Sequence, residues 1–191
     1  SIYGQYGHDF ITGGEGNDFV SAGIGDDTID GGQGADTIFG DAGIDTVTFS
    51  SASRSVRVDL LDPNLSYNDA LGDVYSDIEV FIAGNMVDQL RGDHDANIFY
   101  GGGRTDRLYG RQGNDSLFGE RGADAIYGGR GADTMSGGHE DDRTDRFIYF
   151  SIDESGVGNG NRDVIIDFRS GEDRIEVSRF DADVTTDLNQ E

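Results

Sequence analysis

Most of the chain repeats a nine-residue unit, and this period constrains the fold more than any other feature of the sequence. In each unit of the first array an aspartate at position six stands two residues before a β-branched apolar residue at position eight. The first array has five consecutive units: GQYGHDFIT (4–12), GGEGNDFVS (13–21), AGIGDDTID (22–30), GGQGADTIF (31–39) and GDAGIDTVT (40–48). Six turn residues followed by three strand residues cannot bury an apolar side chain alone, so the period predicts stacked coils with a shared, thin core.

A second array resumes on a different phase and is looser at both ends. Its units are AGNMVDQLR (83–91), GDHDANIFY (92–100), GGGRTDRLY (101–109), GRQGNDSLF (110–118), GERGADAIY (119–127), GGRGADTMS (128–136) and GGHEDDRTD (137–145). Its eighth positions are Leu90, Phe99, Leu108, Leu117, Ile126 and Met135, and the series ends at Thr144. Between the arrays, the stretches SVRVDL and DIEVFIAG predict strands that connect one array to the next.

Composition narrows the classes of partner. The 191 residues include 31 glycines, no cysteine, and 38 acidic against 14 basic residues, for a net charge of −24. Nucleic acid is disfavoured because polyanion binding needs a basic face, and no apolar run is long enough to span a membrane. The absence of cysteine excludes disulfides and thiolate metal sites. A charge of this size opposes compaction, so we expect either a disordered chain or a fold that takes up cations.

The stacked coils place the aspartates close together. One coil contains two units, so residues 18 apart lie on the same edge, about 4.8 Å from each other. Carboxylates at that distance repel in the absence of a cation. Glycines at positions one, two and four allow positive φ and turn carbonyl oxygens toward the space between coils. Such a cage of about six to eight hard oxygen donors suits calcium better than magnesium, whereas low-complexity sequence or a solvated acidic surface would not keep this phase.

The unit G-G-x-G-x-D-x-U-x resembles the calcium-binding repeat of RTX (repeats-in-toxin) proteins. The segment DRFIYFSIDES…RDVIIDFRSGEDRIEVSRFDAD (145–183) is similar to the one that follows the repeats in serralysin-type secreted metalloproteases. The resemblance implies an all-β fold: a parallel β-roll, that is a right-handed β-helix or solenoid, in two stacks with a C-terminal capping β-sheet. The expected organisation is a first roll at 1–48, a connecting β segment at 49–82, a second roll at 83–145 and a truncated capping region at 146–191.

The resemblance also implies a biological setting. Such proteins leave Gram-negative bacteria through a type I secretion apparatus and act outside the cell. The chain is expected to be disordered at low calcium, to fold as a monomer when it binds calcium after export, and to support an attached catalytic or adhesive domain.

The family's ligand pattern predicts five calcium sites. In it, the earlier turn supplies the carbonyls of positions two and four and its aspartate, and the turn 18 residues later supplies those of positions one and three and its own aspartate. Carried over, the first array has Gln5, Gly7, Asp9, Ala22, Ile24 and Asp27; Gly14, Gly16, Asp18, Gly31, Gln33 and Asp36; and Gly23, Gly25, Asp27, Gly40, Ala42 and Asp45. The second array has Gly102, Arg104, Asp106, Gly119, Arg121 and Asp124; and Arg111, Gly113, Asp115, Gly128, Arg130 and Asp133. The resemblance implies three ions in the first array, two or more in the second, and about five to eight in all.

Some units depart from the pattern. Met86, Asp95, Arg104 and Glu140 occupy position four, where glycine is expected, and Asn97 replaces an aspartate. Non-glycine residues resist positive φ, so the pairings 88/106, 97/115 and 124/142 are favoured least. Asp142 also competes with Asp145, because the stretch DDRTD offers a second aspartate three residues later.

Two rival functions follow from other residues. The only histidines, His8, His94 and His139, lie in repeat turns, and neither H-E-x-x-H nor G-x-S-x-G occurs, so we expect no enzyme activity from this segment. A binding role is the alternative: guanidinium groups in or beside successive turns could hold an anionic polysaccharide, as on alginate-modifying enzymes. The arginines concerned are Arg107, Arg111, Arg121 and Arg130. The sequence favours a simpler role for them, which is to screen the aspartates.

Overall fold

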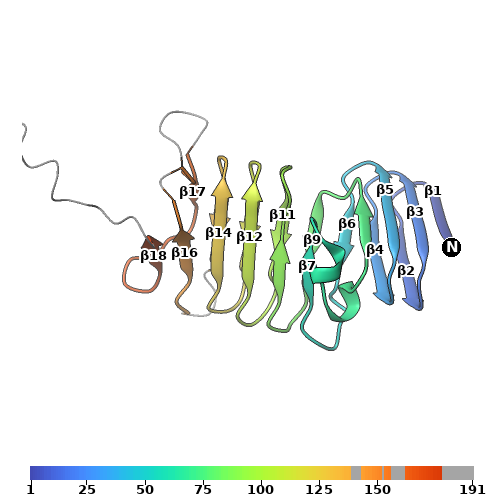
Figure 1. Ribbon diagram of the computed structural model, residues 1–191, viewed down its shortest axis with the longest axis horizontal. Helices are drawn as coiled ribbons and strands as arrows, with labels where there is room; N and C mark the ends of the chain where they lie inside the picture. The colour runs from blue at the N-terminus through green and yellow to red at the C-terminus, as the bar shows by residue number, and fades with distance from the viewer. Residues whose placement is uncertain (139–142, 152, 156–161, 178–191) are drawn as a thin grey trace, which may run out of the picture.

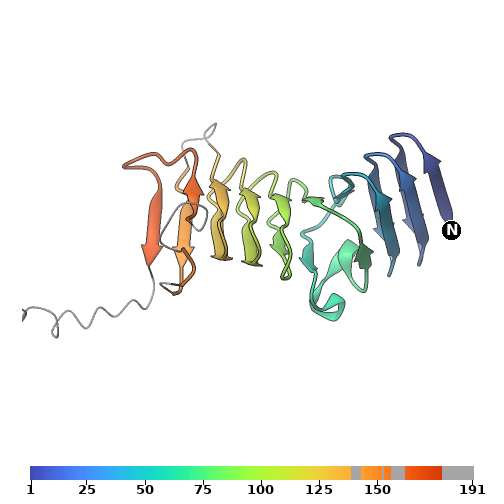
Figure 2. The same cartoon turned by 90° about the horizontal axis from the view of Figure 1, so that it is seen from above.

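The computed structural model describes residues 1–138, 143–151, 153–155 and 162–177. The described chain winds into an elongated solenoid whose coils follow one another along its length (Figure 1). Strands lie in two facing layers, and every pairing between named strands is parallel (Figure 2). The predicted all-β, parallel β-roll is therefore confirmed.

One face of the solenoid is a single eight-stranded sheet, and the other is divided into two sheets. The eight-stranded sheet contains β2 (Phe10–Glu15), β4 (Thr28–Gln33), β6 (Thr46–Thr48), β9 (Val80–Ile82), β11 (Ile98–Tyr100), β13 (Ser116–Phe118), β15 (Thr134–Ser136) and β17 (Val164–Ile165). The four-stranded sheet contains β1 (Ile2–Tyr6), β3 (Phe19–Ile24), β5 (Thr37–Ala42) and β8 (Val74–Ser76). The six-stranded sheet contains β7 (Arg57–Asp59), β10 (Gln89–Arg91), β12 (Arg107–Gln112), β14 (Ala125–Arg130), β16 (Arg146–Tyr149) and β18 (Arg174–Val177).

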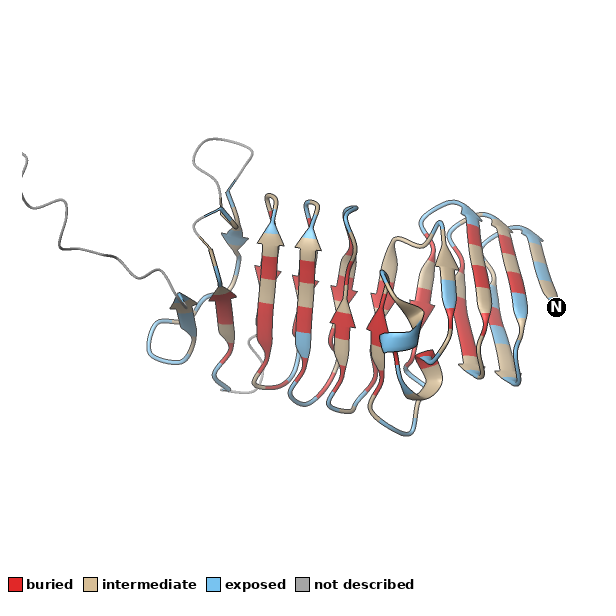
Figure 3. Ribbon diagram, in the orientation of Figure 1, coloured by how far each residue is buried: buried red, intermediate tan, exposed pale blue. Residues whose placement is uncertain are grey.

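The core is the stack of eighth-position side chains between the two layers. Ile29 pairs with Ile11 on one side and with Val47 on the other, which is the 18-residue register that the repeat predicts. Figure 3 shows the resulting buried bands at the same level of successive strands. All predicted core positions are buried: Ile11, Val20, Ile29, Ile38, Val47, Leu90, Phe99, Leu108, Leu117, Ile126 and Met135. Only the middle residue of each strand triplet faces inward, because side chains alternate along a strand.

The connecting segment joins the two arrays on one face and separates them on the other. Val47 pairs with Phe81, and Phe81 pairs with Phe99, so the eight-stranded sheet passes through both arrays. On the opposite face β8 ends the four-stranded sheet and β7 begins the six-stranded one. Strands β7 and β9 lie inside the two stretches predicted to be strands. The short 3-10 helices η1 (Pro63–Leu65) and η2 (Asn68–Ala70) lie between β7 and β8.

Beyond residue 145 the described chain extends both layers. Strands β16 and β18 pair in parallel with the six-stranded sheet, and β17 adds to the eight-stranded one. Phe147, rather than Thr144, takes the next core position, since Phe147 is buried and pairs with Ile126. The last residues of the expected capping region, 178–191, lie outside the described residues. Among those described, no helix combines the length and apolar character needed to cross a membrane.

Candidate metal centres

In the regular turns, the aspartate at position six points its side chain back toward the first residue of the same turn. A Cβ atom added to Gly31 would lie 2.6 Å from Oδ2 of Asp36, so the carboxylate reaches back to the first residue of its turn. The other oxygen, Oδ1, accepts a hydrogen bond from the backbone amide of Asp18 one coil earlier, at 2.8 Å. The same bond joins Asp115 and Asp133 at 2.9 Å. One carboxylate oxygen therefore links two coils while the other points into the turn.

These carboxylates form two columns, one along each edge of the solenoid. The first column consists of Asp9, Asp27, Asp45, Glu79, Asn97, Asp115, Asp133 and Asp163. The second column consists of Asp18, Asp36 and Asp73, and restarts after the connecting segment as Asp88, Asp106, Asp124, Asp145 and Asp173. The structure therefore brings together the two aspartates of each of the five predicted sites.

The Oδ2 atoms, which point into the turns, lack hydrogen-bond donors. Among the described residues, Oδ2 is buried and receives no hydrogen bond in Asp9, Asp27, Asp36, Asp45, Asp106, Asp115, Asp133 and Asp163. A buried, charged oxygen that accepts no hydrogen bond and contacts no cation is destabilising. These oxygens must therefore either bind protons or bind a cation.

The raised pKa values of these carboxyl groups also show that their ionised form is unfavourable. Desolvation by burial raises the pKa of Asp106 to about 9 and that of Asp115 to about 7. The pKa values of Asp45 and Asp133 rise to about 6 for the same reason. Neighbouring carboxylates in the column add to each rise. A cation placed between the turns would remove both causes, because it neutralises the charge and replaces water as a ligand.

Carbonyl oxygens of the earlier turn point toward the later one. A Cβ atom added to Gly32 would clash with the carbonyl oxygen of Gly14, and one added to Gly34 would clash with that of Gly16. These are the carbonyls of positions two and four that the ligand pattern predicts. The same relation holds for the predicted carbonyls of Gln5, Gly7, Gly25, Arg104, Arg111 and Gly113.

Carbonyl oxygens of the later turn point back in the same way. A Cβ atom added to Gly13 would clash with the carbonyl oxygen of Gly31, and the amide of Gly16 donates to the carbonyl of Gln33 at 2.7 Å. Equivalent contacts place the carbonyls of Ala22, Ile24, Ala42, Gly119 and Gly128. The carbonyl of Gly102 accepts from the amide of Arg121, at 3.0 Å. The remaining predicted donors, Gly23, Gly40, Arg121 and Arg130, occupy the corresponding turn positions.

The donor set fits calcium. Among the described residues, no three acidic or histidine side chains converge on one point, so carbonyl oxygens must supply most of the ligands of any ion between the turns. Carbonyl and carboxylate oxygens are hard donors, and calcium accepts about six to eight of them in irregular geometry. Nitrogen and sulfur donors, which zinc and copper prefer, are absent from the predicted sets.

Positive φ separates the regular turns from the irregular ones. Gln5, Arg104 and Arg111 adopt φ of 78°, 80° and 76°, although none of them is glycine. Their turns keep the repeat geometry. Met86 and Asp95, by contrast, do not adopt a positive φ. The turns at 83–88 and 92–97 thus depart from the pattern, in line with the low expectation for their pairings.

Several members of the columns do not follow the nine-residue spacing. Each still precedes an apolar strand residue by two positions, and this acidic-x-apolar triplet is the signal that could have identified them. They are Asp73, Glu79, Asp145, Asp163 and Asp173. The amide of Asp124 donates to Asp145 Oδ1 at 2.8 Å, so Asp145 is the partner of Asp124, and Asp142 lies outside the described residues.

The four arginines of the polysaccharide hypothesis lie in different surroundings, and the hypothesis stays a prediction. Arg111 donates two hydrogen bonds, of 2.9 and 2.8 Å, to the fully buried carboxylate of Asp59. Although burial would raise the pKa of Asp59, its hydrogen bonds and ion pair with Arg111 hold that pKa below its ordinary value. Arg107 lies on the six-stranded sheet, whereas Arg121 lines a pocket beside the eight-stranded one.

The histidines lie where the sequence predicts them. The ring Nδ1 of His8 accepts a hydrogen bond from the amide of Asp26 at 2.8 Å, which links two successive turns. His8 and His94 are both exposed, and His139 lies outside the described residues.

Comparison with known families agrees with this geometry. A family model described as the RTX calcium-binding nonapeptide repeat, in four copies, matches residues 1–29, 12–47 and 100–135. The matches cover the first array and the most regular units of the second. A search of curated proteins returns no match, and the similarity of the tail to serralysin-type proteases stays a prediction. The matched repeats, the parallel coils and the paired oxygen-lined turns together fit an RTX β-roll with calcium-binding nonapeptide repeats.

Proposed function

We propose that this β-roll is a calcium-dependent folding module of a secreted protein. The observation that carries the proposal is the set of buried Oδ2 atoms without hydrogen-bond donors, in an array whose facing turns also bring carbonyl oxygens together. Calcium supplies the positive charge that these oxygens lack. The turn pairs 4–9 with 22–27 and 13–18 with 31–36 are the best-supported sites, because all four predicted carbonyls of each lie against the facing turn.

The same charges account for the proposed behaviour before export. At low calcium the columns repel, and a net charge of −24 keeps the chain extended and suited to passage through a type I secretion apparatus. Outside the cell, calcium binding supplies folding free energy. The folded roll then supports an attached domain, in which we place any catalytic or adhesive activity.

Circular dichroism against calcium concentration tests this proposal. The chain should lose its strand signal in excess chelator and regain it when calcium is added, and magnesium at the same concentration should not replace calcium. Calorimetric titration should count about five to eight ions per chain. A complete strand signal in chelator, with a melting temperature that calcium does not change, would rule out calcium-dependent folding.

A second candidate function rests on the outer face of the six-stranded sheet. Tyr109 stacks on Tyr127 with ring centroids 4.3 Å apart, and Tyr127 stacks on Phe150 at 5.3 Å. Arginines flank this aromatic ladder at the seventh or equivalent positions, which point outward: Arg57, Arg107, Arg146 and Arg174. A basic, aromatic face on so acidic a protein suits an anionic polysaccharide.

Retention on alginate separates this candidate from simple charge screening. Arg107→Ala should reduce retention in calcium, because Arg107 is exposed on the face in question. Arg130→Ala is the matched control, since Arg130 is an exposed arginine of a turn. Equal retention of the two variants and the parent chain would leave screening as the role of these arginines.

A further inference from the structure

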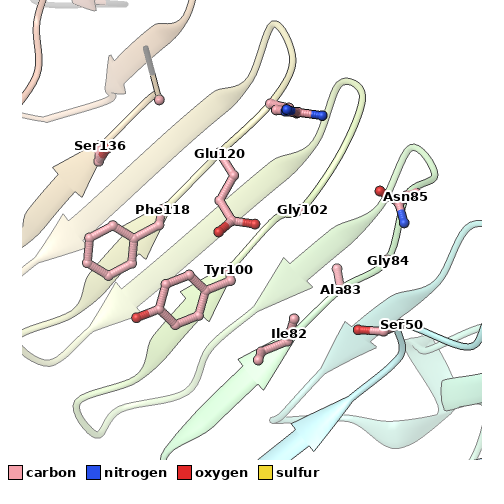
Figure 4. Close-up of a pocket in the computed structure, with 12 residues that line it drawn as sticks. Ser50, Ile82, Ala83, Gly84, Asn85, Tyr100, Gly102, Phe118, Glu120 and Ser136 are labelled. Atoms are coloured by element: carbon pink, nitrogen blue, oxygen red, sulfur yellow. The ribbon is translucent and has the colours of Figure 1, made fainter. Parts of the chain in front are cut away.

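A pocket lies on the face of the second array that the eight-stranded sheet forms, where this sheet meets the turns of one edge (Figure 4). Its volume is about 540 Å³. The wall is a row of four residues in register across four strands. Tyr100, Phe118 and Ser136 are ninth residues of their units, and Ile82 of the connecting segment pairs with Tyr100. These side chains point outward from the core, since the residues at position eight point inward.

Glycines open the pocket on the turn side. Position two of the four adjoining turns is occupied by Gly84, Gly102, Glu120 and Gly138 in succession. Three of these four positions have no side chain to fill the space beside the aromatic rings. Gly103 leaves room for the Asn85 side chain of the pocket wall, because the Asn85 side-chain oxygen lies 2.9 Å from where a Cβ atom of Gly103 would be. The pocket therefore results from these small residues and not from a gap between strands.

The two rings provide a flat apolar surface. Tyr100 and Phe118 are stacked with centroids 4.9 Å apart and planes 13° from parallel. Figure 4, which looks into the pocket, shows both rings nearly face-on, with the Glu120 side chain extending toward them. A ligand with one apolar face can cover such a pair of rings.

Polar groups around the rings are charge-balanced. Glu120 and Arg121 both line the pocket and carry opposite charges. Within the part of the chain that the structure describes, no hydrogen bond or ion pair reaches the Glu120 carboxylate. The Asn85 amide and the Ser50 hydroxyl add groups that can both donate and accept. A purely aliphatic ligand would leave these groups unpaired, and a strongly charged one would meet no net opposite charge.

We propose that this pocket binds a neutral hexopyranose unit of a carbohydrate. The C–H face of a pyranose ring covers aromatic rings, and its hydroxyl groups donate to a carboxylate and exchange hydrogen bonds with an amide. The volume holds one or two such rings, as expected of a pocket for small ligands. This site is separate in position and chemistry from the basic face of the six-stranded sheet.

Calorimetric titration of the whole chain in saturating calcium tests the site, with cellotetraose, maltotetraose and mannotetraose as probes. At least one neutral tetrasaccharide should bind, and Tyr100→Ala should weaken its binding about tenfold through loss of the stacking surface. Phe118→Leu should weaken binding similarly while it keeps an apolar side chain in place. Glu120→Ala should also weaken it, since the hydroxyl acceptor is lost.

Phe39→Ala is the matched control, because Phe39 is a ninth-position aromatic residue of the first array that contacts Phe19 on the four-stranded sheet. It should leave binding of the tetrasaccharide unchanged. Calcium stoichiometry, measured in the same samples, separates this site from the proposed folding function. Unchanged calcium binding together with no affinity for any of the three probes overturns the carbohydrate site alone. Preferential binding of a charged uronate oligosaccharide, or an equal loss in Phe39→Ala, overturns it as well.

Discussion

At the scale of single residues, position six of the unit provides a carboxylate and position four provides space for a carbonyl oxygen. The aspartate at position six has one oxygen that links coils and a second that needs a cation, as in Asp36. The glycine at position four keeps the path of a carbonyl oxygen open, as Gly34 does for Gly16. These two requirements explain why the unit contains residues that are costly to order.

Replacing Asp36 should remove one calcium site. We expect Asp36→Ala to bind one ion fewer and, at calcium 100-fold above the dissociation constant, to lose about 3 kcal/mol of unfolding free energy. Asp26→Ala removes the same charge from position five, where the side chain is exposed, and should keep the full ion count. Calorimetry and thermal melts in calcium measure both effects. An unchanged stoichiometry in Asp36→Ala would show that the site is misassigned.

A pair of glycine substitutions separates backbone strain from blocked coordination. Gly16 and Gly34 both have positive φ, of 108° and 154°, but only a Cβ atom at Gly34 would clash with a carbonyl of the preceding coil. Both alanine variants should lose about 1 kcal/mol from strain. Gly34→Ala should in addition lose one calcium ion, and Gly16→Ala should not. The hypothesis of carbonyl ligation fails if both variants bind the parent number of ions.

At the scale of elements, a buried ion pair ties β7 to the end of β12. Asp59 closes β7 and has a fully buried carboxylate, which Arg111 contacts at 2.8 Å and Arg91 at 3.3 Å. A buried pair contributes little by itself but is costly to break from one side. It therefore fixes where the connecting segment joins the second array.

Breaking this pair from one side should destabilise the roll. Arg111→Met leaves the Asp59 carboxylate buried with less compensation and should cost about 3 kcal/mol. Adding Asp59→Leu should recover most of that loss, since the buried carboxylate is removed and the remaining Arg91 side chain is 30% exposed. Arg107→Met, on the exposed part of the same strand, should change stability by less than about 0.5 kcal/mol. Denaturant unfolding in calcium gives these values, and additive losses in the double variant would exclude the coupling.

At the scale of the whole molecule, the columns link folding to both calcium and pH. The folded-state pKa values of Asp106 and Asp115 are raised to about 9 and about 7, from 3.8 for an ordinary aspartate. Between the unfolded value of 3.8 and these raised values, Asp106 and Asp115 thus hold more protons in the folded, ion-free chain than in the unfolded chain. The stability that Asp106 and Asp115 contribute is fully present below about pH 4 and is lost as the pH rises toward 9.

Acid should therefore partly replace calcium. In chelator, we expect more strand signal at pH 5 than at pH 8, whereas with saturating calcium the signal should be high at both. Calcium affinity should rise with pH over the same interval, because protons and calcium compete for the same oxygens. Circular dichroism and calcium titrations at each pH measure both trends. An ion-free chain that becomes more stable as the pH rises would contradict the assignment of these buried carboxylates.

The sequence by itself determined the parts of the molecule that depend on regular spacing. A strict nine-residue period repeats each contact 18 residues later, so the parallel coils, the core residues and the facing turns of the arrays were all predictable. Tertiary structure alone decided the irregular parts. Asp73, Glu79 and Asp145 follow their column partners by 37, 34 and 21 residues. None of these separations is the 18 residues that the repeat predicts. There the register follows from strand pairing and from burial of the next apolar side chain, and the role of Arg111 follows from a carboxylate 52 residues away.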